Sequence, residues 1–316
     1  MTAVPRFSGT WPANVLEVLL FLFVTIGGLI PAHLENEKYA LLFSGIQPLI
    51  LLSFLFLRIS KRKQNPPYSF LFIFIGLILW SVSGLHGFIS DPEILKRIHY
   101  EGAVASIILG VGSRLIPGIL GHVEIVQMQR HIYEKPLSIL KTVPLHFFFL
   151  IALFVGSYFI KEELGNWARS IIVCLIAFIY WKLHRFPKDR SALTWNIWIA
   201  AWLIVLSFIL RAVWPDGMIH ASHSFFINGI ALLSFLIATR VLQSHGPKNK
   251  MLENKKVLFL ITFLVFLASA TRVSAYILPE QYLSHLAYSS LVLALAAIIW
   301  AQQYLRFIFI FPKGSQ

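Results

Sequence analysis

The sequence predicts an all-α fold, a polytopic bundle of about ten transmembrane helices with repeated helical hairpins. Charged residues make up only 13% of the 316 residues, hydrophobic residues make up 57%, and there are 27 phenylalanines. A water-soluble domain has roughly a quarter of its residues charged, so that class is excluded. Apolar runs of roughly 18 residues or more recur along the chain, and each can cross a bilayer core of about 30 Å. Spans of this length are helical because lipid offers no hydrogen-bond partner to the backbone.

Ten apolar runs are predicted to span the bilayer, and together they form one integral-membrane domain over residues 1–316. They cover about 14–32, 40–57, 69–88, 101–119, 144–160, 167–184, 194–213, 223–241, 256–275 and 284–308. The first two form an N-terminal helix pair over 14–57, and the others form the repeated hairpins of 69–310. The first run is too long for a signal-peptide core and no small-residue cleavage site follows it, so we expect a real span.

Lysine and arginine gather in every second connection. They are dense from Arg58 to Lys63, after the second run, and from Lys248 to Lys256, after the eighth, whereas the intervening connections carry few. Because basic residues accumulate in cytoplasmic loops, both termini are predicted to be cytoplasmic. The net charge of +13 then reflects orientation in a lipid bilayer, and nucleic acid is not an expected partner. The single cysteine, Cys174, excludes internal disulfides and multi-cysteine metal sites.

Three hairpins share a pattern in which an apolar helix ends in a basic residue, a turn with proline and an acid follows, and a histidine begins the second helix. The sets are His86, Asp91-Pro92-Glu93 and His99; Arg211, Pro215-Asp216 and His223; and Arg272, Pro279-Glu280 and His285. Such residues are costly at the ends of membrane helices, so their recurrence predicts a site built from repeated hairpins. The predicted orientation places all three turns on the outer side.

The outer side therefore carries one set of candidate site residues. The candidate metal ligands are His86, His99, His220, His223 and His285, and the candidate cofactor-binding residues there are His99, Arg211 and Arg272. Neutral imidazole binds copper, haem iron and zinc, and ligands from several helices can converge inside a bundle. Guanidinium groups can neutralise haem propionates or an anionic substrate. The alternative is that these residues lie at the water interface, where a polar tip costs little.

A second set of candidates lies near the inner side. It consists of Arg114 and Arg240 as cofactor-binding residues, with His122 and His245 beside them. Each arginine follows a hairpin histidine by fifteen to seventeen residues, roughly 22–26 Å along a helix and nearly the width of the bilayer. The arginines either bind a cofactor or extend to the cytoplasmic phosphates. The small residues of 102–114 allow close packing of a helix or of a flat ligand.

Several short motifs resemble the NnrS family. The segment GAVASIILGVGSR, Gly102 to Arg114, is similar to the signature helix of that family, and His223 to Arg240, with Ser244-His245-Gly246 after it, resembles the same element again. The last hairpin, with Ala270-Thr271-Arg272-Val273 and the stretch from Trp300 to Arg306, is similar to the C-terminal helix pair of the family. The likeness covers about residues 70–310.

The resemblance implies a multi-pass protein of the bacterial cytoplasmic (inner) membrane that binds haem, copper or both through histidines. It further implies a role in the response to nitric oxide and nitrosative stress, with nitric oxide or another small molecule as ligand and oligomers as a further possibility. Two other readings stay open: a transporter of a small anionic solute and a membrane assembly or scaffold subunit. No catalytic triad, nucleotide-binding loop or paired-carboxylate motif is visible, so any enzymatic activity would depend on the cofactor.

Overall fold

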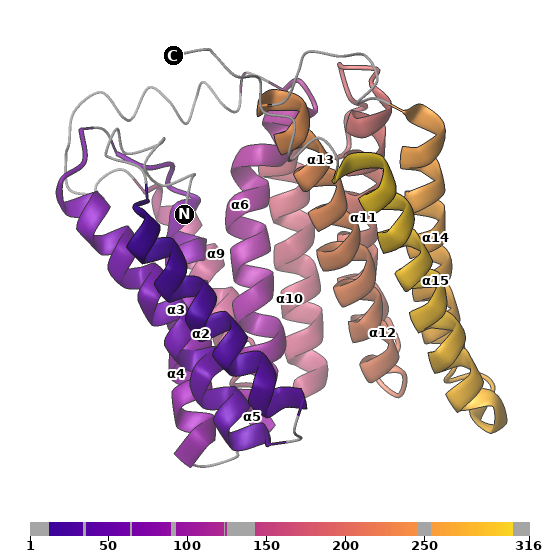
Figure 1. The fold of residues 1–316 in the computed structure, drawn as a ribbon, viewed down its shortest axis with the longest axis horizontal. Helices are drawn as coiled ribbons and strands as arrows, with labels where there is room; N and C mark the ends of the chain where they lie inside the picture. Colours follow the sequence, from indigo (N-terminus) through magenta and orange to yellow (C-terminus); the bar gives the residue numbers. More distant parts are fainter. Residues whose placement is uncertain are drawn as a thin grey trace. The chain divides into compact units, whose positions relative to one another are not determined.

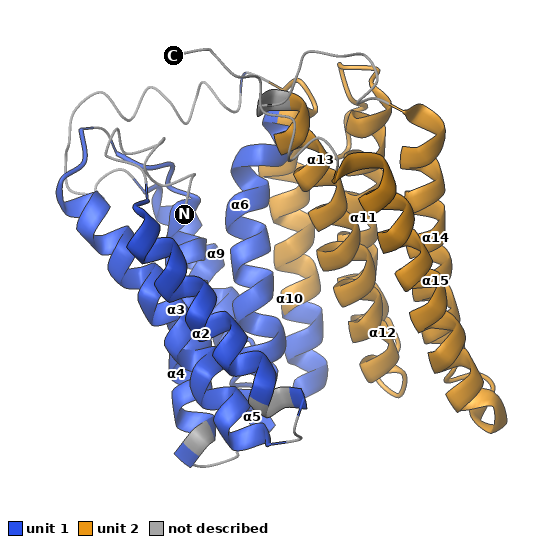
Figure 2. Cartoon of the chain, viewed as in Figure 1, with its two compact units in different colours: residues 1–118, 123–168 blue, residues 119–122, 169–316 orange. Residues whose placement is uncertain are grey.

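The protein is helical throughout the part of the chain that its computed structural model describes (Figure 1). That part comprises residues 13–33, 36–63, 65–89, 93–122, 124, 143–245 and 254–305. No strand occurs in these ranges, so the predicted all-α class is confirmed. The described residues form two compact units (Figure 2), the first over 1–118 and 123–168 and the second over 119–122 and 169–316.

Eight helices within the described ranges are long and apolar enough to cross a membrane. They are Glu37–Ser60, Phe70–Gly87, Glu93–Ile119, Glu162–Trp181, Ala192–Val213, Met218–Gln243, Lys255–Ser274 and Pro279–Tyr304. These helices correspond to eight of the ten predicted runs. The other two runs coincide with shorter apolar helices, Val15–Ile30 and Leu145–Gly156. A multi-pass membrane protein is therefore confirmed, while ten spans and two cytoplasmic termini stay predictions.

Unit 1 holds the N-terminal helices. They are α2 (Val15–His33), α3 (Glu37–Ser60), α4 (Phe70–Ile89), α5 (Glu93–Arg97), the π-helix η1 (Ile98–Gly102), α6 (Ala103–Ile119), α9 (Leu145–Gly156) and the first residues of α10 (Glu162–Ile176). Helices α3 and α4 pack with their backbones in contact, because a Cβ atom built on Gly84 would lie 2.8 Å from the Cα atom of Gly45. Close packing of this kind depends on small residues at the crossing point.

A half-buried ion pair joins α2 to α3 in unit 1. The two terminal nitrogens of Arg58 donate to the two carboxylate oxygens of Glu17 at 2.8 and 2.7 Å, and the guanidinium lies 3.7 Å from the ring centroid of Phe54. Arg58 is 0% exposed. Its place in the basic run after the second span suggested a loop residue that sets orientation, whereas the structure shows a bidentate pair inside the protein.

Unit 2 holds the C-terminal helices. They are the rest of α10, the π-helix η2 (Ala177–Trp181), α11 (Ala192–Val213), α12 (Met218–Ser224), the π-helix η3 (Phe225–Leu232), α13 (Leu233–His245), α14 (Lys255–Ser274), the 3-10 turn η5 (Pro279–Gln281) and α15 (Tyr282–Tyr304). Aliphatic residues from α11, α13 and α14, such as Ile197, Leu236 and Ile261, form its core. Continuous apolar faces on several helices are what a membrane bundle requires.

The three hairpins of the sequence pattern are helix–turn–helix pairs in the structure. They join α4 to α5 and η1, α11 to α12, and α14 to α15 (Figure 1). The turn residues Asp91 and Pro92 lie outside the described ranges. His99 lies within η1, and His223 lies two residues before η3. Short π-helical segments are frequent at functional sites, so the pattern places two of its three histidines in or beside such segments.

Candidate functional site

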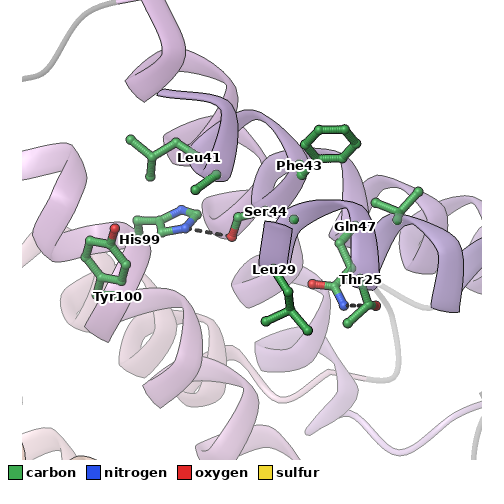
Figure 3. Close-up of a pocket in the computed structure, with 11 residues that line it drawn as sticks. Thr25, Leu29, Leu41, Phe43, Ser44, Gln47, His99 and Tyr100 are labelled. Carbon is green, nitrogen blue, oxygen red and sulfur yellow. Dashed lines mark hydrogen bonds between the residues drawn. The ribbon is translucent and has the colours of Figure 1, made fainter. Parts of the chain in front are cut away.

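His99 is buried inside unit 1, where each of its ring nitrogens contacts a serine hydroxyl group. It is 3% exposed, and its Nε2 atom lies 2.9 Å from Ser44 Oγ on α3 (Figure 3). Its Nδ1 atom lies 3.0 Å from Ser83 Oγ on α4. The Ser83 hydroxyl donates its only proton to the Leu79 carbonyl at 2.6 Å, so Ser83 Oγ must accept from Nδ1–H. The Nε2 lone pair of His99 then accepts from the Ser44 hydroxyl.

The chain of hydrogen bonds begins at an indole. Trp80 Nε1 donates to Ser44 Oγ at 2.9 Å, Ser44 donates to His99, and His99 donates to Ser83. Both ring nitrogens of His99 are thus hydrogen-bonded while the imidazole is neutral. A metal ion at Nε2 would have to displace the Ser44 hydroxyl, so His99 is held as a satisfied core residue in this conformation.

In unit 2, His220 and His285 each direct Nδ1 at the last turn of α14. The Nδ1 atom of His220 lies 3.4 Å from the Arg272 carbonyl oxygen. That of His285 lies 3.2 Å from the Thr271 carbonyl oxygen and 3.0 Å from Ser274 Oγ, whose own proton goes to Thr271 at 2.9 Å. All these acceptors require a proton on Nδ1, which leaves the lone pair on Nε2.

No described residue hydrogen-bonds the Nε2 atom of His220 or His285. A histidine that donates Nδ1–H to a carbonyl oxygen and keeps Nε2 free has the arrangement usual for a metal ligand, because the backbone fixes both the tautomer and the ring direction. Both side chains are half-buried. These two imidazoles are therefore the best-prepared ligands among the predicted site residues.

His223 differs, because a cation occupies its lone pair. The terminal nitrogen Nη2 of Arg272 donates to His223 Nε2 at 2.9 Å, and the Arg272 guanidinium carbon lies 5.8 Å from the ring centroid of Tyr282. We refer to His220, His223, Arg272 and His285 as the α14 cluster. An anionic group would compete with His223 for Arg272, since charge-assisted bonds from guanidinium to carboxylate are the stronger ones.

The structure also places the remaining candidates. Arg211 is 2% exposed near the end of α11. His86 is exposed in the last turn of α4, Arg114 is half-buried on α6, and Arg240 is exposed on α13. His122 is buried in unit 2 directly after Gly121, which has a φ of +82° that favours glycine. His245 ends α13, and its side chain lies outside the described part.

His99 belongs to unit 1 and the α14 cluster to unit 2, so their predicted convergence stays a prediction.

A metal-binding test on the described residues limits which cofactor they fit. They contain no group of three or more histidine, cysteine, aspartate or glutamate side chains placed to hold a metal ion. A copper centre with three protein ligands therefore does not fit the described residues as they stand. Haem iron takes one or two imidazole ligands, and His220 and His285 each keep an Nε2 atom that no described residue hydrogen-bonds.

Several polar residues form buried hydrogen bonds in the structure but were not predicted from the sequence. Serines hold His99 from two other helices, and Glu101, only 5% exposed, accepts a hydrogen bond from the Tyr158 hydroxyl at 3.1 Å. In unit 2, the Asn228 side-chain nitrogen donates to Ser224 Oγ and Ser269 Oγ at 3.1 and 2.9 Å. Single serines and asparagines in apolar helices have no characteristic spacing, so only their intramembrane position could have signalled them.

Comparison with known proteins supports the resemblance. The sequence model of one family, described as NnrS protein, matches residues 1–310, almost the entire chain. No curated protein and no solved structure matches the chain. The match covers the three hairpins, the segment from Gly102 to Arg114 and the α14 cluster alike. The chain belongs to the NnrS protein family.

Proposed function

We propose that the protein is a membrane haem protein that acts in the response to nitric oxide, with the haem held by the α14 cluster of unit 2. The observation that carries the proposal is the pair of imidazoles, His220 and His285, whose Nδ1–H groups are fixed by the backbone of α14 and whose Nε2 lone pairs are free. Family membership adds support, since NnrS proteins are described as haem- and copper-containing proteins of the bacterial cytoplasmic membrane that are linked to nitrosative stress.

The residues of the cluster would share the work of binding. His220 or His285 would supply an imidazole nitrogen to the iron, while Ser274 and the Thr271 carbonyl oxygen keep the His285 ring in one tautomer. Arg272, which donates to His223 in the absence of ligand, would neutralise a propionate. Haem iron, when bound, supplies a centre to which a diatomic gas such as nitric oxide can bind. Copper would need several ligands at one point, and the described residues hold no group of three or more histidine, cysteine, aspartate or glutamate side chains placed to bind a metal ion.

An absorption spectrum tests the proposal. Full-length protein purified in detergent from a haem-replete host should show a Soret band that shifts on reduction with dithionite. His220→Gln and His285→Gln should lower the haem content, and the double variant should abolish it. His184→Gln is the matched control, because His184 is an exposed unit 2 histidine that stacks on Phe178. Colourless wild-type protein, or equal haem content in all variants, would refute haem binding by this cluster.

A carrier for a small anionic solute is the second candidate, and Arg211 favours it. A guanidinium 2% exposed inside an apolar span is costly, and charged residues within membrane spans commonly mark the path of a substrate or an ion. Uptake of an organic anion into proteoliposomes by colourless protein, lost in Arg211→Gln, would select the carrier. A third class, an assembly or scaffold subunit, would be selected by a stable co-purifying protein with neither haem nor transport.

A further inference from the structure

Unit 1 contains a cavity of about 270 Å³ between α2, α3 and η1. Its walls include Thr25, Leu29, Phe43, Gln47 and Tyr100, with the His99–Ser44 pair beside them (Figure 3). Sites for drug-sized ligands have volumes of roughly 300–1,000 Å³, so this cavity suits a smaller group, about one substituted ring. We propose that it binds the head of a quinone, a neutral flat ring with two carbonyl oxygens and an apolar tail.

The lining excludes charged ligands. No aspartate, glutamate, lysine or arginine is among the described residues that line the cavity, and most of the lining is aliphatic or aromatic. An ion placed there would lose part of its hydration without gaining a counter-charge, which is unfavourable. The occupant must therefore be neutral and largely apolar, with a few polar atoms for the polar groups of the wall.

Gln47 presents a donor and an acceptor to the cavity. Its side-chain nitrogen donates to Thr25 Oγ1 at 2.7 Å, and the Thr25 hydroxyl donates onward to the Phe21 carbonyl at 2.8 Å. Gln47 keeps its second N–H and its carbonyl oxygen, and no other described residue hydrogen-bonds them. A carboxamide of this kind can donate to the carbonyl of a quinone and accept from the hydroxyl of a quinol.

Ser44 provides the second polar point, one helical turn from Gln47 on the same face of α3. Positions three apart on a helix have Cβ atoms about 5–6 Å from each other, so both side chains can contact one small ring in the cavity. The Ser44 hydroxyl donates to His99 Nε2 in the absence of ligand, and a ligand carbonyl would compete for this proton. A saturated acyl chain would contact the apolar wall but would form no hydrogen bond with Gln47 or Ser44.

The side of the cavity formed by α2 lets α2 approach α3 closely and lets a ligand enter from the lipid. A Cβ atom built on Gly28 would lie 3.2 Å from Phe43 Cβ, so glycine keeps α2 near α3. Beside the cavity, Ile26 and Leu29 are exposed on α2. Exposed aliphatic residues on a membrane helix face lipid, so an apolar tail can lie along α2 while the ring occupies the cavity.

Photolabelling of the full chain in detergent tests the proposal. An azido derivative of decylubiquinone should label peptides that contain Ser44, Gln47 or Tyr100, and excess decylubiquinone should suppress the labelling with a saturable dose dependence. Gln47→Leu should weaken this competition about five- to tenfold, the effect of one lost hydrogen bond. Ala40→Leu, which enlarges a side chain of the cavity wall, should weaken it by more than about tenfold, since a leucine there occupies the space of the ring. Labelling needs no haem, so it stands apart from the test of the proposed function.

Two matched substitutions control for nonspecific effects. Gln302→Leu and Ala270→Leu change exposed residues on α15 and α14 of unit 2 and should leave the competition within about twofold. Absent saturable competition, label outside unit 1, or a Gln47→Leu variant that competes as well as wild type would each overturn the proposal. Decanol tests the other possible source of an occupant, a lipid chain. If decanol suppresses labelling as well as decylubiquinone does, the cavity holds an acyl chain and the quinone proposal is wrong.

Discussion

His99 in the first hairpin and His285 in the third hold matching positions in the sequence pattern, and their Nδ1 atoms are held alike. Each Nδ1–H donates to a serine on the preceding helix at 3.0 Å, Ser83 in one case and Ser274 in the other. The Nε2 atoms differ. That of His99 accepts from Ser44 on a third helix, whereas no described residue hydrogen-bonds that of His285. The hairpin thus fixes the tautomer of its histidine, and the helix packed beside the hairpin decides whether the lone pair is free.

The largest expected effect is on stability in the first hairpin. Ser44→Ala removes the acceptor of Trp80 and the donor to His99 together, which should destabilise the full chain by about 2 kcal/mol. Denaturant titration in detergent measures the loss, and Ser290→Ala, an exposed serine on α15, serves as the control within about 0.5 kcal/mol. Equal stability of the two variants would contradict the hydrogen-bond chain around His99.

The second-largest expected effect is a difference in chemical reactivity between the imidazoles of His285 and His99. Diethyl pyrocarbonate acylates a free imidazole lone pair, so His285 should react about tenfold faster than His99, which must first break its bond to Ser44, a difference of about 1.4 kcal/mol in barrier. Mass spectrometry of the labelled peptides gives both rates from one sample of haem-free protein. Comparable rates at the two residues would remove the distinction drawn between the hairpins.

The smallest expected effects are losses of stability when the serine that contacts Nδ1 of each histidine is removed. Ser274→Ala should cost only about 0.5 kcal/mol, because the Nδ1–H of His285 keeps the Thr271 carbonyl as acceptor. Ser83→Ala should cost about 1 kcal/mol, because the His99 Nδ1–H group loses Ser83 Oγ and keeps only the backbone of Trp80 as a partner. Both losses follow from the same denaturant titration. A larger cost at Ser274 than at Ser83 would show that the two anchors are not equivalent in the way described.

The sequence allowed the helices and the hairpins to be predicted, because bilayer thickness fixes the length of an apolar span and the turn residues mark its ends. It also pointed to His220, His285 and Arg272, since polar residues at helix ends in a membrane are rare. It could not distinguish His99 from His285, because Ser44 lies 55 residues from His99 and no local pattern links them. The prediction that Arg58 is a loop residue was wrong for a related reason. In the sequence, an arginine in a loop and an arginine paired inside the protein cannot be distinguished, because the partner Glu17 lies 41 residues away on another helix.

The hydrogen bonds around His99 begin and end on neighbouring residues of α4, at the Trp80 indole and the Leu79 carbonyl. An indole N–H can only give a proton and a carbonyl oxygen can only receive one, so the circuit through Ser44, His99 and Ser83 has a favoured direction. In the reverse direction Ser44 Oγ would accept from both Trp80 and His99, and Ser83 would turn its proton from the Leu79 carbonyl to His99 Nδ1. The circuit therefore favours the tautomer of His99 with its proton on Nδ1, and exchange of the two tautomers breaks the bond from Ser83 to Leu79.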